Sequence, residues 1–305
     1  MSKTRKIVIR VGHSLLSLFA VLLLVFSLVR LTGDPINFLL EPGAPQAQRD
    51  NIREQLALDK SVPQQFVAYV GQLTRGDLGM SFVYRIPVTD LMGQRAPATL
   101  TMGAGAIFLT LLLGVPMGVY AAKWRGGKFD RAVRGSAAVF QSLPDFWMGF
   151  ALILIFAVRL DWLPSGGYGS LGNLVLPSVT LALPAIAGLT RLLRSSMIEE
   201  LESDYVVFHR IKGTPERTIL WKHAMRNASL TTMSYLGIVI AGLFTGSVLV
   251  ETIFNWQGLG LLFISGISDR DFGIVQGVML IYALAYIGVN LLVDVSYTIL
   301  NPRLR

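Results

Sequence analysis

Long stretches with almost no charged residue alternate with short basic clusters along this chain. Six of these stretches can cross a membrane as helices, because about 20 apolar residues span a roughly 30 Å hydrocarbon core. They cover residues 11–29, 96–122, 136–158, 171–190, 234–250 and 273–293. We therefore predict an all-α polytopic membrane protein with six transmembrane helices.

Prolines interrupt two of the six stretches. Pro144 precedes Asp145 near the start of the third, and Pro177 and Pro184 lie inside the fourth. Both are predicted as kinked helices, since neighbouring helices in a bundle can satisfy the backbone groups that a proline frees. Residues 252–268 are also uncharged, but glycines break them, so they are predicted as a partly inserted loop or a short helix.

The composition agrees with a membrane protein. Of 305 residues, 52% are apolar and only 15% are charged, against roughly 25% charged in an ordinary soluble domain. There is no cysteine, which excludes a disulfide scaffold, a cysteine nucleophile and a cysteine-ligated metal. The net charge of +8 comes from short clusters between apolar stretches rather than from one patch, so nucleic-acid binding is not expected.

The basic clusters predict the orientation of the chain. With the amino terminus inside, the cytoplasmic segments hold 18 of the 27 Lys and Arg residues, as the positive-inside rule requires. Both termini are therefore predicted to be cytoplasmic. The first stretch could instead be a signal peptide, but its apolar core is longer than the usual 7–15 residues, which favours a membrane span or a signal anchor.

The chain divides into four predicted parts. Residues 1–31 form the cytoplasmic amino terminus and first span, 32–95 an extracytoplasmic loop, 96–300 a core of five helices, and 301–305 a cytoplasmic tail. Apolar residues recur at helical spacing within 46–70, which predicts one or two short amphipathic helices in the outer loop.

No residue pattern points to an enzyme. The nearest approach to a phosphate-binding loop, Gly126-Gly127-Lys128, lacks the first glycine and the hydroxyl residue of that motif. His13, His209 and His223 have none of the spacing of a zinc helix. We expect no metal, no cofactor and no catalytic residue.

Three carboxylates, Asp145, Glu251 and Asp294, lie within or at the edge of predicted spans, and a structural pairing is expected for Asp294 at the inner end of the last one. Charged residues there are costly and are functional candidates by default, so Asp145 and Glu251 are assigned to the translocation path or its gating. The alternative is that each is paired with a backbone or basic neighbour near the interface. No span carries a carboxylate at its middle, which weakens the case for a proton-driven carrier.

The segment between the fourth and fifth spans is far longer than a hairpin needs. Met197, Leu201, Tyr205 and Phe208 stand at helical spacing among acidic residues, which predicts an amphipathic helix. Gly213-Thr214-Pro215 then ends one helix and begins another. A helix pair on the inner face suggests a docking element, although a plain surface helix pair has the same pattern.

Several blocks of this chain resemble the permeases of binding-protein-dependent ABC importers, in the dipeptide, oligopeptide and nickel branch. The similar blocks occur in the family's order and cover nearly the whole chain. They are Gly76–Ser81, Asp145–Gly149, Trp162–Tyr168, Asp204-Tyr205, Arg210–Gly213, His223–Ala228, Val250–Phe254, Asn290–Asp294 and Asn301–Arg303.

The resemblance implies the type I ABC importer permease fold, with residues 195–228 as a coupling loop that docks on a cytoplasmic ATPase. The implied coupling residues are Asp204, Tyr205, Arg210, Lys212, Gly213 and His223. It also implies a second permease subunit, two ATP-binding subunits that perform the ATP chemistry, and an extracytoplasmic solute-binding protein. The location that it implies is a bacterial inner membrane. This chain departs from the family pattern at His209 and Ile211, where small residues are usual.

The resemblance implies a di- or oligopeptide as the transported solute. Nickel, glutathione and sugars are alternatives within the same family. A stand-alone secondary transporter and a membrane-anchored receptor remain as alternatives of other classes.

Overall fold

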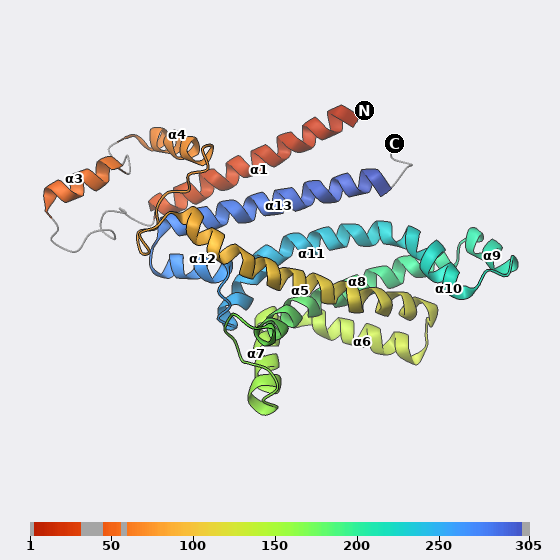
Figure 1. Cartoon of the computed structure of the whole chain (residues 1–305). Helices are drawn as coiled ribbons and strands as arrows, with labels where there is room; N and C mark the ends of the chain where they lie inside the picture. Colours follow the sequence, from red (N-terminus) through yellow and green to blue (C-terminus); the bar gives the residue numbers. More distant parts are fainter. Residues whose placement is uncertain (1–2, 32–44, 56–59, 301–305) are drawn as a thin grey trace. The chain divides into compact units, whose positions relative to one another are not determined.

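The computed structural model describes residues 3–31, 45–55 and 60–300, which fold almost entirely into helices (Figure 1). The α-helices are α1 (Lys3–Leu31), α3 (Gln46–Gln55), α4 (Val62–Leu73), α5 (Val88–Lys123), α6 (Lys128–Ser142), α7 (Asp145–Leu152), α8 (Leu171–Leu201), α9 (Asp204–Ile211), α10 (Glu216–Thr218), α11 (Met225–Ile253), α12 (Leu259–Ser268) and α13 (Phe272–Leu300). Two π-helical segments, η1 (Ile153–Arg159) and η2 (Ile219–Ala224), follow α7 and α10. The prediction of an all-α protein is confirmed.

All six predicted stretches lie on helices, but the count of six spans is not confirmed. Three helical segments of the described chain are long and apolar enough to cross a membrane: Val88–Lys123, Leu171–Leu201 and Phe272–Leu292. Two bent pairs, Lys128–Ser142 with Asp145–Arg159 and Thr232–Leu243 with Ser247–Ile253, raise the number to five if each is one span. Within α1, the residues that this comparison covers form a shorter apolar helix, Gly12–Ser27.

The third predicted stretch is broken rather than kinked. Its two helices, α6 and α7 with η1, meet at 107°. Leu143 is extended, with ψ 134°, because the ring of the following proline excludes the helical conformation at that position. Pro144 then caps α7. The prediction of a single kinked helix at Pro144 was therefore wrong. Helix α8, by contrast, is continuous through Pro177 and Pro184.

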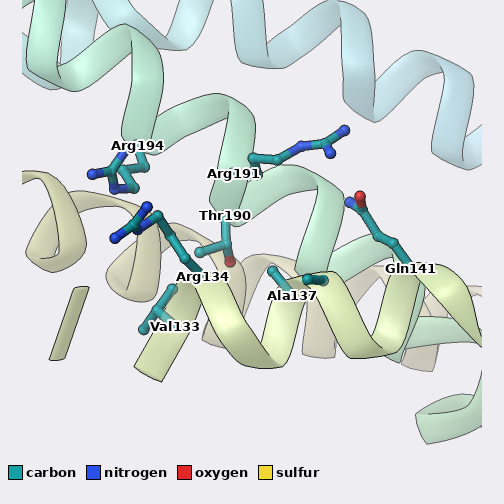
Figure 2. Close-up of a pocket in the computed structure, with 8 residues that line it drawn as sticks. Val133, Arg134, Ala137, Gln141, Thr190, Arg191 and Arg194 are labelled. Atoms are coloured by element: carbon teal, nitrogen blue, oxygen red, sulfur yellow. The ribbon is translucent and has the colours of Figure 1, made fainter. Parts of the chain in front are cut away.

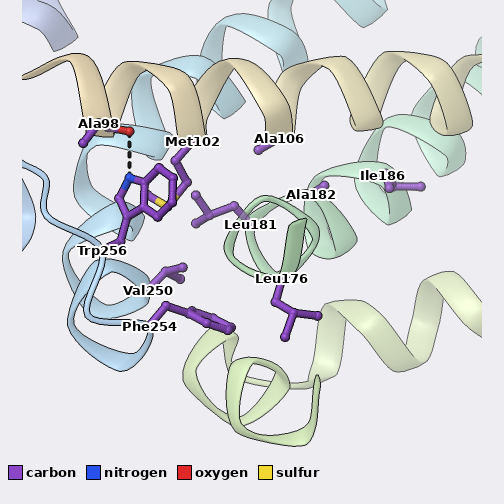
Figure 3. Packing of buried hydrophobic residues seen from close by; sticks show 10 residues of the cluster. All are labelled: Ala98, Met102, Ala106, Leu176, Leu181, Ala182, Ile186, Val250, Phe254 and Trp256. Carbon is purple, nitrogen blue, oxygen red and sulfur yellow. Dashed lines mark hydrogen bonds between the residues drawn. The ribbon is translucent and has the colours of Figure 1, made fainter. Parts of the chain in front are cut away.

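The described chain divides into two compact units. One contains residues 97–261 and 288–305, and the other contains 1–96 and 262–287. In the first unit, α5, α8 and the end of α11 meet in an apolar core, and the indole Nε1 of Trp256 donates a hydrogen bond of 2.8 Å to the Ala98 carbonyl (Figure 3). The buried members of this core are Ala98, Met102, Ala106, Leu176, Leu181, Ala182, Ile186, Val250, Phe254 and Trp256.

Glycines bring α5 and α8 into close contact. A Cβ atom at Gly114 would lie 3.0 Å from Leu189, and one at Gly118 would lie 3.0 Å from the Leu193 side chain. Small residues allow such approaches between membrane helices, where packing replaces the hydrophobic effect as the driving force. A second cluster continues this contact into the predicted coupling loop; it consists of Val119, Ala122, Leu193, Met197, Leu220, Ala224 and Ala228.

The second unit contains the two short helices predicted in the outer loop. Helices α3 and α4 lie within or overlap residues 46–70, in agreement with the helical spacing. The Phe26 ring of α1 packs against Phe66 and Tyr69 of α4, with centroid distances of 5.2 and 5.8 Å. These aromatic contacts attach α4 to α1.

Candidate functional site

The predicted coupling loop turns sharply at Gly213. Its φ angle is +75°, in the left-handed region that costs a residue with a Cβ roughly 1–2 kcal/mol. The Gly213 and Thr214 amides donate back to the carbonyls of Arg210 and His209 and end α9. Pro215 then caps α10. The break predicted between two helices is therefore present.

The amphipathic helix predicted before this turn is two helices instead. Helix α8 ends at Leu201 and α9 begins at Asp204, so Met197 and Phe208 do not share a face. Met197 is fully buried against α5, whereas the Phe208 side chain is 54% exposed. Ser203, whose extended backbone precedes α9, separates the two helices and overrides the helical spacing.

A polar cluster joins the ends of α8, α9 and α11. The Tyr205 hydroxyl donates to the Glu200 carboxylate at 2.6 Å. The Asn227 amide donates to the same carboxylate oxygen and to the Tyr205 oxygen, both at 3.1 Å. Burial and the adjacent Glu200 raise the pKa of Tyr205, so it remains a neutral donor. The cluster fixes the angle at which α9 leaves α8.

An ion pair links the two sides of the turn. The Arg210 guanidinium contacts the Glu216 carboxylate at 3.1 Å, and both side chains are more than 40% exposed. An exposed pair of this kind contributes about 0–1 kcal/mol, so its value is in orientation rather than stability. The pair directs the Arg210 side chain toward Glu216, on the far side of the turn.

The His209 and His223 rings stack at the base of the turn. Their centroids are 4.0 Å apart, with 27° between the planes. Desolvation, the charge of His209 and the charge of Lys222 all lower the pKa of His223. His209, identified from the sequence only as a departure from the family pattern, is thus the direct partner of a predicted coupling residue.

The outward side of α9 is apolar. Ile211 is 79% exposed and Phe208 54%, while Val206 on the opposite side is fully buried. The Lys212 ammonium lies 4.2 Å from the Phe208 ring centroid, over its face. Asp204 is exposed at the first turn of α9. The exposed surface of this helix combines an apolar patch with charges of both signs.

Of the six predicted coupling residues, all lie on or beside this turn, but they face different ways. Asp204, Arg210 and Lys212 are exposed, whereas Tyr205 and His223 make contacts within the loop. The sequence reasoning missed Glu200 and its link to Asn227. Asn227 belongs to the block His223–Ala228, whose resemblance to the family was the available signal; nothing in the spacing identified Glu200.

Glu251 occupies a fully buried position at the end of α11. Its carboxylate accepts hydrogen bonds from the Thr99 hydroxyl at 2.7 Å and from the amides of Gly260 and Leu261 at 2.7 and 3.0 Å. The two amides belong to the first turn of α12, where a carboxylate is favoured by the unpaired N–H groups. Glu251 therefore clamps α11 and the start of α12 to α5.

Asp145 is the first residue of α7, directly after the break at Pro144, and is partly buried. It lies on a different element from Glu251, and no hydrogen bond or ion pair joins these two carboxylates. Among the residues that the structure describes, no group of three or more His, Asp or Glu side chains could hold a metal ion. The turn at Gly213 and the hydrogen bonds of Glu251 each connect one helix to another, an arrangement that can transmit a movement of the loop to the membrane helices.

Residues 114–305 match the family model described as binding-protein-dependent transport system inner membrane component, and the chain belongs to this family. It is therefore a membrane permease of the ABC importer class, a transport subunit rather than an enzyme. Membership implies ATPase partners and a second permease subunit. It also makes the chain a multi-pass protein of the inner membrane.

Curated relatives match almost the full length of the chain. A probable peptide ABC transporter permease protein of Sinorhizobium fredii is 38% identical over 291 residues, covering 92% of this chain and 93% of the relative. A glutathione transport system permease protein of Escherichia coli is 37% identical over 290 residues, 95% of each chain. A putative peptide transport system permease protein of Brucella abortus is 36% identical over 311 residues, 99% of each.

The fold is that of a solved importer. An inward-facing structure of the MetNI methionine ABC transporter aligns with a TM-score of 0.61 at 19% identity, covering 70% of this chain and 97% of that one. This likeness confirms the predicted type I importer permease fold.

Proposed function

We propose that this chain forms half of the membrane path of an importer for di- or oligopeptides, which an extracytoplasmic solute-binding protein delivers. Relatives named as peptide permeases, matching more than nine-tenths of the chain, support this substrate class. The relative named for glutathione, itself a small peptide, supports glutathione as the second candidate. The predicted topology belongs to the same proposal: both termini and residues 195–228 face the cytoplasm, and residues 32–95 face outward.

The single structural observation that carries the mechanism is the rigid turn at Gly213. Asp204, Arg210 and Lys212 and the apolar side chains of α9 are proposed to enter a groove of the ATPase. Tyr205 and His223 hold the loop's shape from within, through Glu200 and His209. Since Leu220 and Ala224 pack on α5 and α8, displacement of the turn moves those helices as packed bodies. In this way, the ATP-driven closure of the ATPase subunits would switch the membrane path between its open and closed states.

The path is proposed to run along the contact with the second permease, partly beside α11. Ile238 of α11 is 67% exposed, so it faces away from this chain's own core. A cysteine placed at Ile238 should react with a thiol reagent at a rate that depends on substrate or nucleotide. A rate that is the same in every state would contradict this placement. Asp145 and Glu251 are proposed to act on the path indirectly. Asp145 does so at the start of α7, and Glu251 does so by joining α11 and α12 to α5.

The function is tested by uptake into liposomes that contain the assembled complex and its binding protein. We expect ATP-dependent uptake of labelled di- and oligopeptides, with glutathione as a competing substrate and nickel and a sugar as controls. Uptake of glutathione but not of other peptides selects the second candidate. Uptake by this chain alone, without an ATPase, would overturn the proposal.

A matched pair of glycine variants tests the role of the turn. Gly213 and Gly126 have φ angles of +75° and +77°, and a Cβ at either would meet nothing within 4 Å. Alanine therefore introduces the same backbone strain at both positions, about 1–2 kcal/mol. We expect Gly213→Ala to lower peptide uptake per ATP hydrolysed, and Gly126→Ala to leave that ratio unchanged. An equal effect of both variants would remove the special role of the turn at residue 213.

A further inference from the structure

A small basic pocket lies between α6 and α8. Its volume is about 150 Å³, and it has an apolar floor that includes Val133 and Ala137. Three arginines, Gln141 and Thr190 supply its polar side chains, and the Thr190 hydroxyl donates to the Gly114 carbonyl. Figure 2 shows Arg134 and Arg194 together near one end and Arg191 reaching from α8 toward the end where Gln141 lies. No part of the transport mechanism proposed above uses this pocket.

The pocket carries more positive charge than the chain neutralises. Asp130 accepts from Arg194, with an Nη2 to Oδ2 distance of 2.8 Å, and it lies 3.6 Å from the Nε atom of Arg134. One buried carboxylate thus faces two guanidinium groups. Arg191 makes no hydrogen bond or ion pair with any other residue that the structure describes. Its guanidinium and about one further positive charge are available to an anion.

The position of the pocket along the helices indicates which anion it meets. The uncharged stretch of α6 begins at residue 136, just after Arg134, and that of α8 ends at residue 190, just before Arg191. The edges of the two apolar stretches therefore coincide at the pocket. This edge is the level of the headgroup layer, where basic pockets between membrane helices bind anionic lipids.

We propose that this pocket binds the phosphate of an anionic phospholipid headgroup. The planar guanidinium of Arg191 matches two phosphate oxygens, and Gln141 can donate to a third. A cavity of about 150 Å³ holds a headgroup phosphate but is smaller than the roughly 300–1,000 Å³ of pockets for larger ligands.

Native mass spectrometry of the assembled transporter in detergent tests the proposal. The delipidated complex is titrated with phosphatidylglycerol, with phosphatidylcholine, which has a phosphate but no net charge, and with inorganic phosphate. Phosphatidylglycerol should be retained in preference to phosphatidylcholine. Arg191→Gln should lower its affinity about fivefold, the value of one basic side chain at a membrane surface. Arg131→Gln, which removes an exposed arginine of α6 outside the pocket, should leave it unchanged.

Three results would overturn the proposal. Equal losses in both variants would show that the lipid responds to general surface charge. Displacement of phosphatidylglycerol by an equal concentration of inorganic phosphate would make this a site for a soluble anion. Equal retention of the two lipids would remove the role of net charge. If Arg191→Gln prevents assembly, Arg191→Lys is used instead. Lysine keeps the positive charge but cannot donate two parallel hydrogen bonds to a phosphate, so unchanged retention of phosphatidylglycerol in this variant would also contradict the site.

Discussion

The Thr99 hydroxyl donates a 2.7 Å hydrogen bond to the buried Glu251 carboxylate, joining α5 to the end of α11 across 152 positions of the sequence. The same hydroxyl accepts from the Leu259 amide at 2.8 Å. The remaining carboxylate oxygen accepts from the amides of Gly260 and Leu261. Two side chains therefore satisfy three amides at the start of α12, where a helix has no backbone acceptors of its own.

Replacing Glu251 by alanine should destabilise the complex strongly. It leaves the Thr99 hydroxyl and the Gly260 and Leu261 amides buried without an acceptor, at about 1–3 kcal/mol for each unsatisfied group. Glu251→Gln keeps one oxygen for the amides and places a donor near Thr99, so it should be milder. The midpoint of thermal unfolding of the assembled transporter measures both. Equal midpoints for the two variants would show that the hydrogen bonds do not hold this junction.

Replacing Ile211 by aspartate should weaken assembly with the ATPase without affecting the fold of this chain. Ile211 is 79% exposed, so no internal contact is lost, whereas a charge in an apolar interface pocket costs well over 1 kcal/mol, or about tenfold in affinity. Co-purification of the ATPase with the tagged permease measures the change. Val62→Asp, at an apolar residue 59% exposed on α4, is the control that should assemble normally. Normal assembly of the Ile211 variant would place the docking surface elsewhere.

Acidification should loosen the turn at Gly213. Because the pKa of His223 is lowered below its ordinary value of 6.5, the folded loop favours the neutral ring. This contribution to stability is present above pH 6.5 and is lost as the pH falls below that value. The protection of residues 204–228 against hydrogen exchange, after correction for the intrinsic pH dependence of amide exchange, should therefore be lower at about pH 5 than at about pH 8, the range in which histidines titrate.

His209 should account for part of that pH dependence. Its positive charge is one of the causes that lower the pKa of His223, and its ring stacks on the same side chain. In His209→Ala the loss of protection on acidification should be smaller, while His13→Ala should behave as the wild type. An unchanged response in the His209 variant would mean that His209 does not contribute to the pH dependence of the loop.

The sequence predicted the helices and the break at Gly213, but it did not predict which other positions interrupt a helix. Prolines at 116, 177 and 184 lie inside continuous helices, whereas Pro144 ends one. The difference is in the packing available to satisfy freed backbone groups, which a single sequence does not contain. The break between Leu201 and Asp204 was missed for a similar reason: helical spacing continues across it, but the Tyr205–Glu200 contact requires a change of direction.

The candidate site was predictable in its location but not in its contacts. Gly213 and Pro215 have conformational preferences that are local, so the turn could be read from the sequence. The partners of Glu251 and His223 lie on other elements and depend on tertiary packing. No periodicity connects Thr99 with Glu251 or His209 with His223.

A final prediction concerns the buried carboxylate of Asp271, which caps α13. It accepts from the Ser81 hydroxyl at 2.6 Å, the Val83 amide at 3.1 Å and the Ile274 amide at 3.3 Å. These bonds hold the loop after Met80 against the start of α13. Ser81→Ala and Asp271→Asn each remove part of the contact, so the double variant should lose less stability than the two single losses combined, by about 1 kcal/mol. Thermal unfolding of all four forms gives the coupling, and limited proteolysis at Arg85 should speed up in each variant. Strictly additive losses would mean that Asp271 stabilises α13 independently of the loop.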